Sequence, residues 1–138
     1  MADIVRFSVS IEEDLMRAFD AFVREKHYAT RSEAIRDAIR QQLVRHEWDE
    51  GEEVAGVITL LFDHHRSGLS DALTEIQHQA LGCIISATHV HLDHSNCLEF
   101  IAVRGNAGTI RRLADRLISL KGVKHGEITA TSTGTHIA

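Results

Sequence analysis

The sequence contains no proline and only two cysteines, Cys83 and Cys97. Without proline, no helix or strand is interrupted by a residue that lacks a backbone N–H. Two cysteines are too few for a disulfide framework, and the chain begins with a charged, alternating segment rather than a signal peptide. No apolar run reaches the length of a membrane-spanning helix. We therefore expect a cytoplasmic protein with reduced thiols and no membrane association.

The acidic residues that give the chain its net charge of −5 are concentrated in one place. Lys and Arg balance Asp and Glu in residues 1–46 and again in residues 54–138, so the whole excess lies in residues 47–53. A short acidic run that contains glycine, between two balanced segments, is typical of a domain linker. We predict a first domain over residues 1–48, a linker over 49–53 and a second domain over 54–138.

The first domain is predicted to contain one strand and two helices. Residues 4–10 alternate between apolar and polar, which is the pattern of a half-buried strand. Capping boxes are predicted at Ser10–Glu13 and at Thr30–Glu33, with helices running from them to about residue 26 and about residue 45. One strand and two helices cannot close a core alone. A twofold dimer with paired antiparallel strands is therefore the simplest arrangement.

The polar residues of this strand, Arg6, Ser8 and Ser10, would project from the two-stranded ribbon of such a dimer. A ribbon of this kind fits the DNA major groove, where arginine and hydroxyl groups can reach base edges or phosphates. The alternative is the solvent-exposed face of an ordinary edge strand. The segment resembles the ribbon-helix-helix family of DNA-binding proteins. That resemblance implies that the start of the second helix, at Thr30–Arg36, lies against DNA phosphate.

The second domain is predicted to have the order strand, helix, strand, strand, helix, strand. The four strands are expected over residues 54–62, 83–90, 98–103 and 128–133. Apolar residues at helical spacing predict the helices over residues 69–76 and 110–118. This is the order of the ferredoxin-like fold, with two helices on one face of an antiparallel sheet. The other face of the sheet would be left open to solvent, so we expect the chain to self-associate through it.

The residues that could bind a metal or act in catalysis lie on the hairpin between the second and third predicted strands of this domain. His89 and His91 are two residues apart on one strand, so both imidazoles face the same side of the sheet. Cys97 opens the next strand and can return beside them. Two imidazoles and a thiolate suit Ni, Cu or Zn rather than Mg or Ca. Candidates for a fourth ligand are His94, His78, His125 and the pair His64 and His65.

Three interpretations of this cluster compete. A closed sensing or structural metal site fits best, provided that a fourth ligand exists. A catalytic metal site would need an open position and a nearby acid or base, for which Asp93 and Glu99 are the nearby carboxylates. The third interpretation is a set of surface histidines around a buried thiol.

With both domains considered, the chain resembles the NikR family of nickel-responsive transcriptional regulators. The most specific part is Thr88-His89-Val90-His91, followed by His94 and Cys97-Leu98-Glu99. The resemblance implies one Ni(II) per subunit, held by His89, His91 and Cys97 of one chain and His78 of a neighbouring chain. Three imidazole nitrogens and one thiolate sulfur would then form a square-planar site. Gln79-Ala80-Leu81 follows His78, where another member of the family has a run of histidines.

The resemblance also implies partners and a function. It implies an α+β protein, with a β-α-α ribbon-helix-helix domain and a βαββαβ domain of the ACT type, assembled as a homotetramer, a dimer of dimers. The expected partner is double-stranded DNA with a pseudo-palindromic operator, and the expected function is repression of nickel-uptake genes rather than catalysis. Arg66 matches a phosphate-contacting position. Glu33 and Asp37 match a secondary cation site, although they could equally be a solvated helix face. The rival functions are metal storage or delivery, and small-molecule sensing by an ACT-type regulator.

Overall fold

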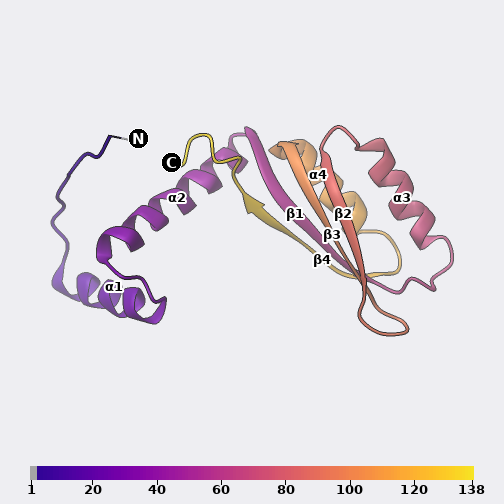
Figure 1. Ribbon diagram of the computed structural model, residues 1–138, viewed down its shortest axis with the longest axis horizontal. Helices are drawn as coiled ribbons and strands as arrows, with labels where there is room; N and C mark the ends of the chain where they lie inside the picture. The colour runs from indigo at the N-terminus through magenta and orange to yellow at the C-terminus, as the bar shows by residue number, and fades with distance from the viewer. Residues whose placement is uncertain (1–2) are drawn as a thin grey trace. The chain divides into compact units, whose positions relative to one another are not determined.

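The computed structural model describes residues 3–138 and separates the chain into two compact units (Figure 1). One unit ends at Leu43 and also includes Ala138, and the other consists of Val44–Ile137. Within the described residues, no helix is both long enough and apolar enough to cross a membrane.

The first unit contains α1 (Glu13–Glu25) and most of α2 (Arg31–Asp49). Glu12 occupies the N-cap position of α1 without a side-chain hydrogen bond, so the capping box predicted at Ser10–Glu13 is wrong. At the second predicted cap, the backbone N–H of Glu33 donates to the hydroxyl of Thr30 over 3.1 Å. That hydrogen bond satisfies one of the free N–H groups at the start of α2.

The strand predicted over residues 4–10 is not formed in the single chain, where residues 3–12 belong to no helix or strand. Its apolar side chains are open to solvent, with exposed fractions from 64% at Val9 to 89% at Ile4. A strand needs a hydrogen-bonded neighbour, and the neighbour expected here is the same segment of a second chain. Because one chain does not supply that neighbour, the segment lies extended with its apolar face uncovered.

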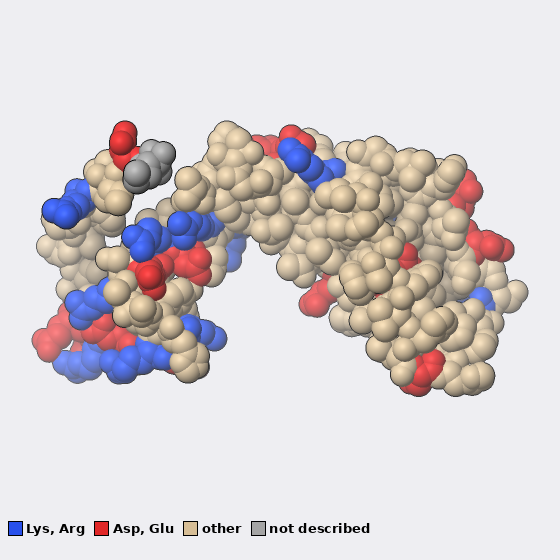
Figure 2. Space-filling view, viewed as in Figure 1, with Lys and Arg blue, Asp and Glu red and all other residues tan. Residues whose placement is uncertain are grey.

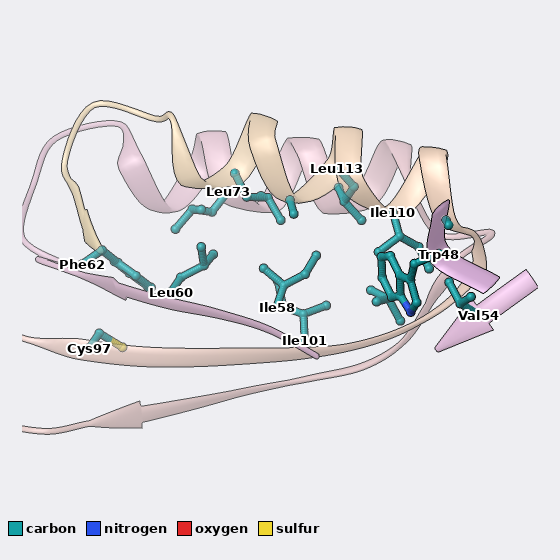
Figure 3. Packing of buried hydrophobic residues seen from close by; sticks show 14 of the residues in the cluster. Trp48, Val54, Ile58, Leu60, Phe62, Leu73, Cys97, Ile101, Ile110 and Leu113 are labelled. Atoms are coloured by element: carbon teal, nitrogen blue, oxygen red, sulfur yellow. The ribbon is translucent and has the colours of Figure 1, made fainter. Parts of the chain in front are cut away.

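The second unit contains β1 (Glu53–Phe62), α3 (Leu69–Gln79), β2 (Ile84–His91), β3 (Cys97–Asn106), α4 (Ala107–Ile118) and β4 (Val123–Thr131). The strands form one antiparallel sheet in the order β2-β3-β1-β4. Both helices cover the same face of this sheet (Figure 3). The predicted βαββαβ order is therefore confirmed.

The core of this unit lies between the sheet and the two helices (Figure 3). Alternate residues of β1 point towards the helices, and Ile58, Leu60 and Phe62 are at most 1% exposed. Ile110 and Leu117 of α4 pack against them and are also fully buried. Near one end of this core Cys97 lies close to Phe62, and Trp48 lies at the other end.

The helix α2 continues to Asp49 instead of ending at about residue 45 as predicted. Its residues from Val44 onward belong to this second unit. Trp48 is 4% exposed, and its indole N–H donates to the carbonyl of Thr131 over 2.8 Å. A Cβ atom added at Gly56 would lie 3.4 Å from the Trp48 ring and 2.8 Å from the carbonyl oxygen of Thr129. Glycine at this position therefore lets the indole ring and β4 approach β1 closely.

Candidate metal centre

The predicted ligands of the β2–β3 hairpin lie on one face of the sheet. His91 is the register partner of Cys97, and His89 is the register partner of Glu99. Because directly opposite residues of an antiparallel pair point to the same side, His89, His91 and Cys97 all face the side covered by the helices. Cys97 is 2% exposed, whereas the two histidines are exposed at the edge of the core. The predicted arrangement of the hairpin is confirmed.

A buried carboxylate lies directly behind this set of residues. Glu99 is 3% exposed, and its Oε2 lies 2.8 Å from Nε2 of His89. Its Oε1 accepts a hydrogen bond of 2.8 Å from the side-chain amide of Gln77 in α3. A carboxylate in this position favours the His89 tautomer that carries a proton on Nε2, which leaves Nδ1 free as a metal donor.

The sequence pattern indicated Glu99 only as a possible acid or base, and its contact with His89 was not predicted. The signal was present in the alternation of β3, since Glu99 has the same parity as the buried residues Cys97 and Ile101. A carboxylate on an inward position requires polar partners, because burial of an unpaired charge is costly. The identity of those partners depends on packing between β2, β3 and α3.

The surroundings of Cys97 favour the protonated form of its thiol. Burial raises its pKa above the ordinary value for cysteine, and the negative charge of Glu99 raises it further. The thiolate is the form that binds a metal, so metal binding at this position must release a proton. The donor set of two imidazoles and one thiol fits Ni, Cu or Zn.

Three of the other histidines gather around His91. The ring centroid of His64 lies 4.8 Å from that of His91 and 4.1 Å from that of His65. The ring of His65 lies 4.8 Å from that of His94, whose carbonyl oxygen is 2.8 Å from Nε2 of His65. Burial lowers the pKa of His64, and the neighbouring rings of His65 and His91 lower it further. His64 is thus held neutral beside the hairpin.

The remaining two candidates for a fourth ligand lie elsewhere. β4 begins at Val123 rather than at residue 128 as predicted, so His125 lies in a strand. It is the register partner of Leu61, whose side chain alternates away from the buried face, and this places His125 on the opposite side of the sheet. His78 is exposed near the end of α3 and lines a cavity of about 340 Å³ together with His89 and Glu99. Among residues 3–138, no hydrogen bond is formed by its imidazole side chain.

A complete metal site is not assembled within the described part of one chain. Among residues 3–138, no three His, Cys, Asp or Glu side chains are arranged to hold a metal ion. The hairpin supplies three donors of suitable type on one face.

The residues expected to contact DNA lie in two places. Arg6, Ser8 and Ser10 are exposed in the extended segment of residues 3–12. Arg66 packs against Gly122, where an added Cβ atom would lie only 2.5 Å from Cδ of Arg66. Gly122 also has φ +107°, so both its backbone conformation and the position of Arg66 disfavour a side chain there.

The predicted secondary cation site is partly engaged in another interaction. Asp37 accepts a hydrogen bond through Oδ2 from the hydroxyl of Tyr28, which joins the loop before α2 to the helix. Glu33 is exposed one turn earlier. The cation site at these two residues stays a prediction.

Two known protein families match this chain, one in its N-terminal part and one in its C-terminal part. Residues 55–131 match the sequence model of the NikR C-terminal nickel-binding domain, and residues 5–46 match that of the ribbon-helix-helix proteins of the CopG family. The chain belongs to the NikR family. The NikR match covers most of the second unit, including β2, β3, β4 and all but the first two residues of β1, so the α+β fold predicted from sequence is confirmed.

Three relatives of this NikR-family chain are named as nickel-responsive regulators. The protein of Pyrococcus furiosus is 52% identical over 135 residues, which cover 97% of this chain and 98% of the relative. That of Geobacter sulfurreducens is 51% identical over 138 residues and 99% of both chains. That of Nitratidesulfovibrio vulgaris is 51% identical over 135 residues and 97% of both chains.

A solved structure resembles the fold of part of this NikR-family chain. An uncharacterized protein from Thermotoga maritima has a TM-score of 0.52 at 16% sequence identity, over 57% of this chain and 98% of that chain. This similarity shows the fold alone.

Proposed function

We propose that the protein is a nickel-responsive, DNA-binding transcriptional regulator that represses nickel-uptake genes. The observation that carries this proposal is the placement of His89, His91 and Cys97 on one face of the hairpin, in a chain that also matches a ribbon-helix-helix domain. The function proposed is regulatory, and no reaction is assigned to the site.

In this proposal, His89, His91 and Cys97 of one subunit and His78 of a neighbouring subunit hold one nickel ion per subunit. The exposure of His78 and the lack of a hydrogen bond to its imidazole among residues 3–138 support a role outside its own chain. The incomplete set of donors among these described residues supports the same arrangement. When bound, nickel would join two subunits through α3 of one and the hairpin of the other.

The proposed assembly is a homotetramer with two ribbon-helix-helix dimers. The uncovered apolar residues of the segment 4–9 support pairing of the N-terminal ribbons. Val90 and Phe100 lie on the sheet face away from the helices, and each is 40% exposed. Exposed apolar residues on this face support association of the second units.

DNA contact is proposed for Arg6, Ser8 and Ser10 at base edges and for Arg66 at phosphate. Figure 2 shows basic and acidic side chains intermixed over α1 and α2 on the visible face, rather than one broad basic surface. Attraction to DNA would therefore depend on local groups, which are Arg6 and the free N–H groups at the start of α2.

Regulation in this proposal is a coupling between two sites. Nickel must bind the DNA-competent arrangement of subunits more tightly than the other arrangements. A ligand that bound all arrangements equally would leave the equilibrium between them unchanged. By linkage, DNA raises the affinity for nickel by the same factor, and a typical coupling free energy is about 1–3 kcal/mol.

The test is footprinting of the full-length protein on DNA selected by the nickel-bound protein. We expect two protected half-sites related by a dyad in the presence of Ni(II), and weak or absent protection after chelation. Protection that is equally strong without nickel would contradict the proposal and favour a storage or delivery protein whose first domain only dimerises.

A further inference from the structure

The helix α3, which carries His78, is most deeply buried in its first half. It has 11 residues, a length at which an isolated helix is marginal in water. Its buried residues are Leu69 and Leu73, and Gly68 at its N-cap makes no side-chain capping bond. In the second half, Ile76 packs against the core but is only partly buried, so apolar packing holds this half less tightly than the first.

Two cavities lie beside the end of α3. One of about 340 Å³ is lined by Gln77 and His78 on the helix and by residues of β2. The other, of about 560 Å³, is lined by Gln79 and by Arg112 and Arg116 of α4. Since a cavity lies on either side of this last turn, polar contacts add to the packing of Ile76 and Ala80 in fixing its position.

The two neighbours of His78 in sequence make such contacts with different elements. Gln77 donates to the buried carboxylate of Glu99 in β3 over 2.8 Å. On the other side, Arg116 of α4 donates through its guanidinium to Oε1 of Gln79 over 3.0 Å. The amide of Gln79 donates in turn to Glu75, one helical turn earlier, over 2.9 Å. Among the described residues, no carboxylate forms an ion pair with Arg116.

We infer that Arg116 is a positioning residue for the nickel ligand His78, acting through its hydrogen bond to Gln79. The inference rests on the proposed function, in which His78 completes a site on a neighbouring subunit. A helix end that is already ordered loses less conformational freedom when its histidine binds, so binding is stronger. The hydrogen bond between Arg116 and Gln79 ties the helix end to α4, and the hydrogen bond between Gln77 and Glu99 ties it to the sheet.

The test compares Arg116→Ala with Arg112→Ala in the full-length protein. Both arginines lie on the exposed side of α4, one turn apart, and both line the 560 Å³ cavity, so the two variants remove the same charge from the same place. Arg112 donates only within its own helix, to Thr109 over 3.4 Å. Any effect of charge alone should therefore appear in both variants.

Arg116→Ala should increase amide hydrogen exchange in the last turn of α3 in nickel-free protein. Its nickel affinity should fall about fivefold, because the net contribution of one hydrogen bond is about 1 kcal/mol. The absorption spectrum at saturating nickel should stay that of the wild type, since the ligands are unchanged. Gln79→Ala should reproduce these effects, and the double variant should lose no more than either single variant.

Equal losses in Arg112→Ala and Arg116→Ala would overturn the inference, because they would assign the effect to charge. Unchanged nickel affinity in Arg116→Ala would overturn it as well, even with faster exchange in α3. Failure of the proposed function would appear differently, as wild-type protein that binds no nickel through the hairpin residues.

Discussion

Nε2 of His89 lies 2.8 Å from Oε2 of Glu99, so an exposed imidazole on β2 is oriented by a carboxylate that is almost completely buried. The second oxygen of Glu99 is occupied by Gln77 at the same distance. One side chain of β3 therefore sets the orientation of a predicted ligand and fixes the helix residue that precedes His78. Glu99 thus joins the hairpin to α3.

Glu99→Gln should weaken nickel binding by about 10- to 100-fold, which is typical for loss of a supporting hydrogen bond to a metal ligand. A neutral amide oxygen accepts a weaker hydrogen bond from His89 than a charged carboxylate does, so the imidazole is oriented less firmly. Nickel titration followed by absorption measures the change. Glu127→Gln on exposed β4 removes the same charge and serves as the control. An equal loss in both variants would assign the effect to net charge.

Cys97→Ala should remove the thiolate-to-metal absorption band and lower nickel affinity by several orders of magnitude. The thiol is the one soft donor on the helix-covered face of the hairpin. Cys83→Ala is the matched control, because Cys83 donates to the carbonyl of Ala80 at the other end of β2. Nickel binding at wild-type strength with an unchanged spectrum in Cys97→Ala would rule out the proposed site.

Nickel affinity should rise with pH at neutral and mildly alkaline values. The pKa of Cys97 lies above its usual value, so the thiol is protonated in the free protein over this range and must lose its proton to bind. Affinity should therefore increase about tenfold per pH unit until the pH passes the pKa of the thiol. Competition titrations at several pH values measure this slope. Cys97→Ala should lose it, and a wild-type affinity independent of pH would show that the thiol is not a ligand.

His78 should act on a neighbouring subunit. His78→Ala and Cys97→Ala proteins, mixed and allowed to exchange subunits, should regain a fraction of intact sites, because one variant supplies the hairpin and the other supplies the helix. The number of sites with the wild-type spectrum is the measurement. After exchange has been demonstrated by mass spectrometry, a count no higher than in either parent would show that each site is formed within one chain.

The pattern of the sequence was sufficient to predict the sheet and the face of the hairpin, because both follow from alternation. β1 and β3 bury every second residue, and this places Cys97 on the same side as the core residues. The start of β4 was missed because Val123–Gly126 has no apolar alternation, and backbone pairing with β1 holds it in the sheet. The end of α2 was missed because its acidic composition suggested a linker, although Trp48 anchors it in the core.

The supporting residues of the site could not be predicted in the same way. Glu99 and Gln77 are 22 positions apart, and their hydrogen bond exists only because α3 packs over β3. The same holds for Arg116 and Gln79, which are 37 positions apart. The ligands repeat at a fixed spacing along one hairpin, whereas the residues that orient them come from separate elements. Local periodicity therefore identifies the predicted ligands but not the residues that orient them.

Arg6→Ala should abolish sequence-specific DNA binding while leaving nickel affinity in the absence of DNA unchanged. Each bidentate contact of arginine with a base contributes about 1–3 kcal/mol of discrimination, and several copies of Arg6 act together in the proposed assembly. The nickel site lies in the other unit, so it should not be affected. Electrophoretic mobility shift with the nickel-loaded protein measures the loss.

Two further variants separate recognition from assembly. Arg17→Ala removes the same charge from the exposed surface of α1, where Arg17 pairs with Glu13, and should leave operator binding nearly intact. Phe7→Ala changes an exposed apolar residue of the same segment as Arg6 and should instead weaken dimerisation, which sedimentation measures. Operator binding that survives Arg6→Ala, or that falls equally in Arg17→Ala, would show that this segment does not read DNA sequence.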